Sequence, residues 1–106
     1  MQNQEILDQI KKISERLKKN YSAQRVILFG SYARREATED SDIDLFIIAP
    51  TKERFFERMA SVKRTIRDLR YGLPISPIVL TPEELDQRVK IGDQFIQGIL
   101  KRGITV

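Results

Sequence analysis

The chain has 106 residues, with 19 lysines and arginines against 15 aspartates and glutamates, and contains neither cysteine nor histidine. The missing residue types exclude disulfides, thiolate or imidazole metal sites and histidine acid–base chemistry. No apolar run approaches the roughly 20 residues of a membrane span, and the polar N-terminus lacks a signal-peptide core. We therefore expect one cytoplasmic domain over residues 1–106, whose net charge of +4 suits an anionic ligand or a basic surface without a partner.

The first predicted element is a helix over about residues 4–19. Its apolar residues recur every three or four positions, which places them on one side of a helix; they are Ile6, Ile10, Ile13 and Leu17. Lys18 and Lys19 suit the C-terminal end of the helix dipole, and Asn20 indicates where the helix stops. We expect this apolar side to pack on a sheet.

Two short apolar runs, residues 25–29 and 43–49, predict buried strands. The first ends at Gly30 and Ser31, where a glycine lets the backbone pass close to a ligand. A short helical turn is expected from Ser31 to Arg34, followed by a polar connection. Because this link is short, we expect the two strands to be antiparallel neighbours.

Asp42 and Asp44 stand at the mouth of the second strand. Residues two apart in a strand share a face, so the two carboxylates should lie side by side, close to the glycine-serine turn. Oxygen ligands suit Mg²⁺ or Mn²⁺, and free N–H groups in a tight turn suit phosphate. One alternative is a solvated strand entrance, since aspartate is common at turns. A calcium loop is excluded, because Leu45 and Thr51 occupy its glycine and glutamate positions.

A long helix is predicted from Thr51, as its N-cap, to about residue 71, with Gly72 ending it. Its apolar residues form a stripe at helical spacing: Phe55, Met59, Val62, Ile66 and Leu69. The opposite side is basic: Arg54, Arg58, Lys63, Arg64, Arg67 and Arg70. We interpret that side as a solvated face rather than a nucleic-acid surface, because few aromatic residues are interleaved there. The Phe55-Phe56 pair is expected to give one core ring and one partly exposed ring.

The last third of the chain predicts a strand over residues 75–80 and helices to about residue 90 and over residues 93–102. Pro77 within the strand indicates an edge or irregular position. The run Thr81-Pro82-Glu83-Glu84 is a capping box, and residues 104–106 are expected to add a short strand. The order of elements predicts an α/β (α+β) fold with a small mixed sheet flanked by helices, including a right-handed parallel crossover through the long helix.

The run Gly30-Ser31-x-Ala33-Arg34, followed by Ser41-Asp42-x-Asp44-Leu45, resembles the signature of the minimal nucleotidyltransferases of the DNA polymerase β superfamily. The resemblance implies the polymerase β-like nucleotidyltransferase fold. It implies that Asp42 and Asp44 are catalytic and hold Mg²⁺ or Mn²⁺, and that Gly30 and Ser31 bind the phosphates of a nucleoside triphosphate, expected to be ATP. Arg34 would neutralise phosphate charge or pair with a nearby acid.

Two positions depart from that family's pattern. Arg35 stands where the family often has glycine. More seriously, the third carboxylate that active members place on the third strand corresponds to Ser76, which is a weak Mg²⁺ ligand and no base near neutral pH. Glu83 and Glu84 are the nearest alternatives in sequence, although helix capping explains them better.

Three functions follow from these observations. The first is an enzyme that transfers a nucleoside monophosphate, AMP from ATP, to a hydroxyl group. The resemblance suggests a helical HEPN-domain protein as partner, with this chain as antitoxin in a homo- or hetero-oligomer. The second is a catalytically weak or inactive binding module that neutralises a partner by contact, because Ser76 replaces an acid. The third is a basic nucleic-acid-binding domain that uses no nucleotide.

Overall fold

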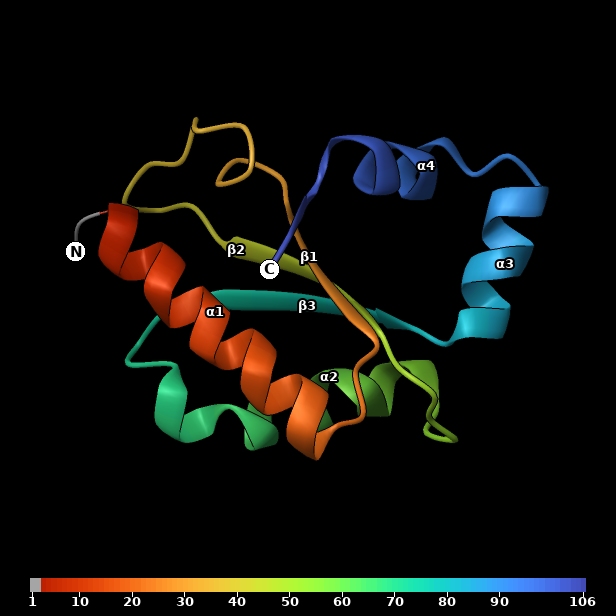
Figure 1. Ribbon diagram of the computed structural model, residues 1–106, viewed down its shortest axis with the longest axis horizontal. Helices are drawn as coiled ribbons and strands as arrows, with labels where there is room; N and C mark the ends of the chain where they lie inside the picture. Colours follow the sequence, from red (N-terminus) through yellow and green to blue (C-terminus); the bar gives the residue numbers. More distant parts are fainter. Residues whose placement is uncertain (1–2) are drawn as a thin grey trace.

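The computed structural model describes residues 3–106. Its elements in chain order are α1 (Asn3–Asn20), β1 (Arg25–Phe29), β2 (Ile43–Ile48), α2 (Phe55–Thr65), the 3₁₀ turn η1 (Arg67–Leu69), β3 (Ile75–Leu80), α3 (Pro82–Lys90), α4 (Gln94–Arg102) and β4 (Ile104–Thr105). Helices lie on both sides of the sheet, as Figure 1 shows. None of these helices is long and apolar enough to cross a membrane.

The four strands form one mixed sheet in the order β3-β2-β1-β4. β1 is antiparallel to β2 and β4, whereas β2 and β3 are parallel. The expected mixed sheet, the antiparallel first pair and the parallel connection through α2 are therefore confirmed. β3 lies at the edge of the sheet, where Pro77 requires no ladder partner on its open side.

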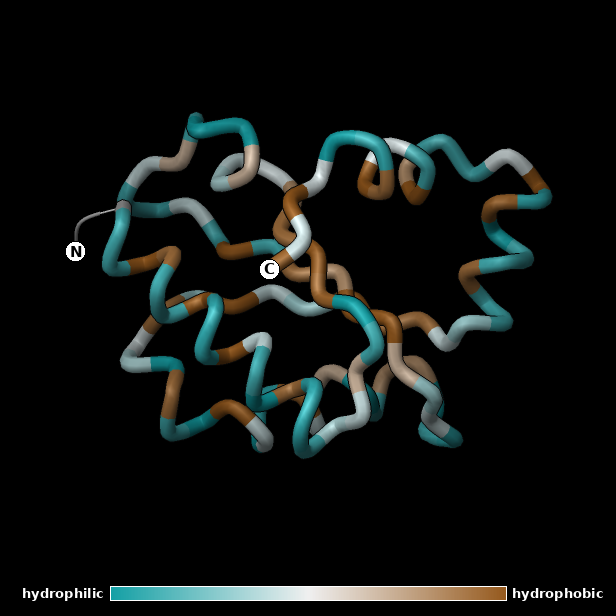
Figure 2. The backbone as a smooth tube through the Cα atoms, in the orientation of Figure 1, coloured by the Kyte–Doolittle hydropathy of each residue, from teal (hydrophilic) through white to brown (hydrophobic). Residues whose placement is uncertain are grey.

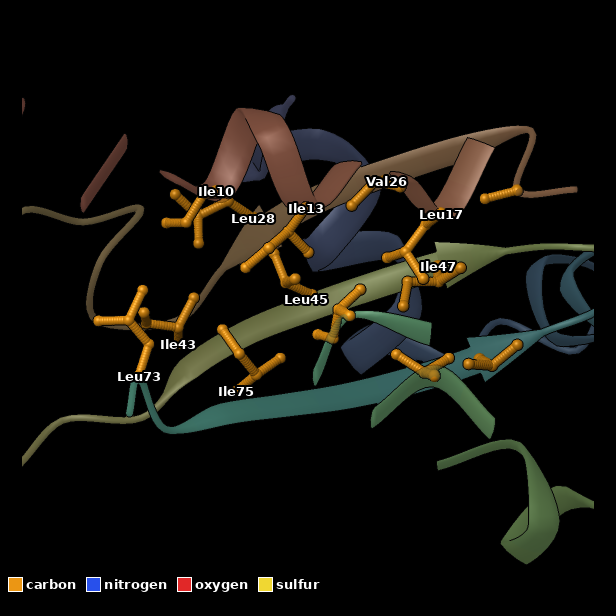
Figure 3. Packing of buried hydrophobic residues seen from close by; sticks show 14 of the residues in the cluster. Ile10, Ile13, Leu17, Val26, Leu28, Ile43, Leu45, Ile47, Leu73 and Ile75 are labelled. Carbon is orange, nitrogen blue, oxygen red and sulfur yellow. The ribbon is translucent and has the colours of Figure 1, made fainter. Parts of the chain in front are cut away.

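The core has two parts, one on each face of the sheet, because alternate strand residues point to opposite faces. One part joins α1 and α2 to residues such as Leu28, Leu45 and Val79, and Figure 3 shows its side chains between the helices and the strands. The smaller part joins α4 to residues such as Ile27 and Phe46. Figure 2 shows the apolar strands at the centre and more polar connections around them.

The helix after β2 begins later and ends earlier than its sequence predicts. Thr51 does not cap it; the Thr51 hydroxyl instead accepts a bond from the Glu53 backbone N–H at 3.1 Å and donates to the Glu53 carboxylate. The N-cap is Arg54, whose N–H donates to the side chain of Glu57 at 2.8 Å. Because the Thr51 hydroxyl bonds to Glu53 in a local turn, it does not cap a helix there. The helix begins at Phe55, after the N-cap Arg54.

The orientation of α2 also differs from the predicted stripe. Phe55 and Phe56 are both exposed, at 60% and 71%, whereas Arg58 is only 5% exposed. Arg58 donates to the Val79 carbonyl at 3.1 Å and makes a two-pronged ion pair with Glu84, at 2.6 and 3.1 Å. Because the side of α2 that carries Arg58 faces β3 and α3, the first-turn aromatic rings point to solvent. The expectations of a core ring at this pair and of a solvated Arg58 are wrong.

Candidate functional site

Asp44 is the one charged residue of the central strand β2. It is the one residue of β2 that is not fully buried, and it lies between Phe29 of β1 and Ser76 of β3. The alternation of the strand puts its side chain on the face of the sheet that α4 covers, together with Phe46. Asp42 precedes the strand and is exposed. The fold thus presents Asp44 at the open end of an otherwise apolar face.

Gly30 follows β1 directly and lies against Asp44. Its φ is +74°, a conformation that side-chain-bearing residues rarely adopt. A Cβ at this position would collide with the Oδ2 atom of Asp44. Only a glycine therefore allows the carboxylate to lie over the backbone at the end of β1.

The turn that follows is closed by backbone hydrogen bonds. The Arg34 N–H donates to the Gly30 carbonyl at 3.1 Å, and the Glu36 N–H donates to the Ser31 carbonyl at 2.9 Å. Within residues 3–106, the N–H groups of Ser31, Tyr32 and Ala33 donate no hydrogen bond. Free N–H groups at the start of a helical turn attract anions, and phosphate is the common biological example.

The charges around Asp44 favour a bound cation. Burial raises the pKa of Asp44 above its ordinary value, the charge of Asp42 raises the pKa further, and Arg34 acts in the opposite direction. Arg34 pairs with Glu36 at 3.1 Å, and both side chains are mostly exposed. Such an exposed pair is weak, so Arg34 can exchange Glu36 for an incoming anion at little cost.

The backbone conformation of Arg35 explains why the family to which the motifs are similar often has glycine at this position. Its φ is +60°, in the left-handed region, and its side chain is exposed. Glycine adopts this conformation without strain, whereas arginine does so at some cost. The turn thus contains an arginine in a conformation that glycine would adopt without strain.

A pocket of about 480 Å³ connects these parts. Its walls are the end of β1 and the following turn, Asp44, and one side of α4; the lining residues include Gly30, Ser31, Arg34, Phe95, Gly98 and Arg102. The structure brings the predicted phosphate turn and Asp44 into one concavity. The α4 residues were not predicted from the sequence, although an exposed aromatic residue, a glycine and an arginine at positions i, i+3 and i+7 of a helix are a detectable signal.

No third carboxylate joins the pair. Ser76 is the register neighbour of Asp44, and no group of three or more histidine, cysteine or acidic side chains assembles anywhere in residues 3–106. Glu84 lies beyond the opposite end of β3, where it accepts from Arg58 and caps α3 through the Thr81 N–H. Neither Glu84 nor the exposed Glu83 replaces the missing acid.

The two aspartates fit a magnesium ion that shares its ligands with a substrate. Mg²⁺ is commonly bound through one or two carboxylates together with phosphate oxygens and water, rather than by a closed protein cage. Asp44, whose pKa is raised by burial and by the charge of Asp42, can supply one carboxylate, and Asp42, exposed two residues earlier and outside the pocket lining, can supply the other. The phosphate oxygens would come from a ligand held on the turn after Gly30.

Comparisons with known proteins show what the whole chain is similar to. Residues 10–104 match the family of the nucleotidyltransferase domain. A protein of Methanocaldococcus jannaschii named a putative protein adenylyltransferase is 38% identical over 104 residues, which cover 96% of this chain and 96% of that protein. A second protein of that name and organism is 41% identical over 81 residues, 71% of this chain; the match spans 52% of that relative, about half its length. The crystal structure of a putative nucleotidyltransferase from Sulfolobus solfataricus has a TM-score of 0.62 and 30% identity, covering 80% of this chain and 75% of the other.

Proposed function

This chain belongs to the nucleotidyltransferase domain family, and we propose from that membership that it transfers AMP from ATP to a hydroxyl group on a protein. The observation that carries the proposal is the meeting of Asp44 with the Gly30-Ser31 turn in one pocket. A carboxylate and a phosphate-binding turn in contact are the arrangement that a metal–triphosphate complex requires. The relatives named as protein adenylyltransferases support adenylyl transfer in particular.

Each residue has a role in this proposal. Asp42 and Asp44 hold Mg²⁺, which, when bound, neutralises charge on the triphosphate and on the departing pyrophosphate. Ser31 and the free N–H groups of its turn hold phosphate oxygens, and Arg34 adds a mobile positive charge. The acceptor oxygen forms a bond to the α-phosphorus while the bond from that phosphorus to the bridging oxygen breaks, and pyrophosphate leaves.

The acceptor hydroxyl must lose its proton, and the described part of the chain offers no third carboxylate to take it. In this proposal the proton passes to solvent or to a base on the acceptor protein. We therefore expect transfer that is slow for this family and dependent on the acceptor. The chain acts as a single nucleotidyltransferase domain, and its partner supplies the acceptor site.

We place that acceptor on a helical HEPN-domain protein, with this chain as its antitoxin; the support is the resemblance of the Gly30–Leu45 motifs to the minimal nucleotidyltransferases. The second candidate is a binding module that neutralises its partner by contact. Ser76 favours it, because a serine beside Asp44 leaves nucleotide binding possible while removing the acid that promotes transfer.

Two measurements test the proposal. First, ATP is titrated calorimetrically with and without Mg²⁺ into the wild type, Asp42→Asn and Asp44→Asn; binding should require Mg²⁺ and be lost in both variants. Second, ATP labelled on its α-phosphate is incubated with the chain and a co-expressed HEPN-domain protein, and label on that protein is measured.

The outcomes separate the candidates. Label on the acceptor, lost in Asp44→Asn, supports transfer. Metal-dependent ATP binding without label supports the binding module. ATP binding that is absent, or that is unaffected by both aspartate changes, overturns both, and salt-dependent RNA binding by the same variants would then favour the basic nucleic-acid-binding domain.

A further inference from the structure

One side of α4 forms the wall of the pocket opposite the phosphate turn. Phe95, Gly98 and Arg102 all line that pocket. They are three and four residues apart, so they share one side of the helix. A Cβ at Gly103, next to Arg102, would collide with the Ile27 side chain, so the end of α4 packs closely against the strand that leads into Gly30.

Phe95 is a large apolar side chain that the core does not use. It is 57% exposed, although Ile96 and Ile99 on the same helix are buried. Its ring meets Phe29 edge to face, with the ring centroids 5.9 Å apart and the planes at 83°. This contact holds the ring at the mouth of the pocket while much of it remains open to solvent. A flat, fixed, accessible aromatic ring in such a place can pack against a nucleobase.

Gly98 makes room for the guanidinium of Arg102. A Cβ at residue 98 would collide with the Nη2 atom of Arg102, so the arginine lies back along the helix over the glycine. Glycine is unfavourable in a helix interior compared with alanine. Arg102 also makes no ion pair among residues 3–106. Gly98 therefore leaves space beside the pocket that the guanidinium of Arg102 occupies.

We propose that α4 is the nucleotide-selecting wall of the site, with Phe95 as the platform for the base and Arg102 as a further cation for the phosphates. This inference rests on the proposed function, because it assumes a metal–nucleotide complex on Asp44 and the Gly30 turn. It extends the site to α4, which contains none of the Gly30–Leu45 motif residues but lines the same pocket. The proposal also gives a function to the pocket that remains between α4 and the end of the sheet face at Asp44.

The two roles are separated by using two ligands, Mg²⁺–ATP and Mg²⁺–tripolyphosphate, which has phosphates but no base. Phe95→Ala should weaken ATP binding about ten-fold and leave tripolyphosphate binding unchanged, because only the base contact is lost. Phe95→Leu keeps the apolar bulk but not the ring and should show the same selective loss. Arg102→Ala should weaken both ligands by about ten-fold, because it removes a charge from the phosphates.

Matched controls lie outside the pocket lining. Ile91→Ala removes another exposed apolar side chain, and Lys101→Ala removes the neighbouring cation of α4. Neither should change either dissociation constant by more than about two-fold. A uniform loss across all four alanine variants would mean that α4 acts through the stability of the fold, which contradicts the proposal.

Gly98→Ala gives an independent test, because a loss of binding in a variant with a higher melting temperature cannot come from misfolding. Alanine should raise the melting temperature by about 4 °C, because it favours the helix. It should also weaken both ligands, but by less than Arg102→Ala does, because its methyl group occupies the present position of the guanidinium and the flexible arginine side chain has to move. If Gly98→Ala and Arg102→Ala leave binding intact, Arg102 has no role in the site. If the wild type binds neither ligand, the proposed function itself is wrong. If the wild type binds both ligands and the Phe95 and Arg102 variants bind as the controls do, only the role of α4 is wrong.

Discussion

Ser76 lies directly beside Asp44 in the parallel β2–β3 ladder, with its side chain on the same face of the sheet. The two residues are neighbours in space although they are 32 positions apart in the chain. A carboxylate at residue 76 would meet the same ion as Asp44. The register therefore identifies the residue at which the proposed transfer can be tested against binding alone.

Ser76→Asp should convert weak or absent adenylyl transfer into transfer that is faster by roughly 100-fold, the usual contribution of a positioned acid–base group. Label transfer from ATP to the acceptor measures this change. Ser22→Asp, which adds the same charge at an exposed turn, is the control. Equal transfer in the wild type and Ser76→Asp would show that this position is not the missing acid.

Asp44→Asn should stabilise the metal-free protein while abolishing Mg²⁺-dependent ATP binding. The pKa of Asp44 is raised by burial and by Asp42, so the folded state disfavours its ionised form. The folded state then binds more protons than the unfolded state, and stability falls as the pH rises through the pKa of Asp44. At pH 7 the asparagine should raise the free energy of unfolding by up to about 1 kcal/mol.

Urea denaturation without divalent ions checks this gain. Asp40→Asn, at an exposed position of the same connection, is the control and should change stability very little. A loss of stability in Asp44→Asn would contradict the electrostatic account of the site.

Gly30→Ala and Gly72→Ala form a matched pair. Both glycines have positive φ, +74° and +76°, but only at Gly30 would the new methyl group collide with Asp44, whereas nothing lies within 4 Å of Gly72. Both variants should lose about 1 kcal/mol of stability from backbone strain. Only Gly30→Ala should also lose ATP binding, which calorimetry can measure; equal binding in the two variants would show that the contact with Asp44 is dispensable.

Glu84→Gln should make the free energy of unfolding depend less on pH below about pH 5. The ion pair with Arg58 holds the pKa of Glu84 below its ordinary value of 4.5. A carboxylate with a lowered pKa contributes stability above its unfolded pKa, and this contribution disappears as the pH falls through the folded pKa. The wild type should therefore lose more stability than Glu84→Gln between about pH 5 and pH 3. Parallel curves from urea denaturation at each pH would refute the coupling.

Phe56→Ala and Phe46→Ala test the observed orientation of α2. Phe56 is exposed, so its removal should change the free energy of unfolding by less than about 0.5 kcal/mol. Phe46 is fully buried, and its removal should cost about 3–5 kcal/mol. A large loss in Phe56→Ala would contradict the exposed position of that ring.

The sequence predicted the elements whose signals are local. The apolar runs of β1 and β2, the capping box from Thr81 to Glu84 and Pro77 at an edge each depend on a few consecutive residues, and all appear in the structure. The same locality made Gly30, Ser31, Asp42 and Asp44 recognisable as a candidate site. The predicted start of α2 at Thr51 was wrong because the Thr51 hydroxyl bonds to the backbone N–H and the carboxylate of Glu53 instead of capping a helix. The sequence pattern does not distinguish these two uses of a threonine hydroxyl.

Local patterns were enough to predict the two-strand unit with its glycine turn and acidic pair, because side-chain alternation and backbone freedom act over a few bonds. Three facts became visible only in the folded chain: Ser76 is the neighbour of Asp44, Arg58 is buried against Glu84, and α4 lines the pocket. Those facts depend on strand register and helix rotation. Both are set by packing among residues far apart in the chain, which no local spacing encodes.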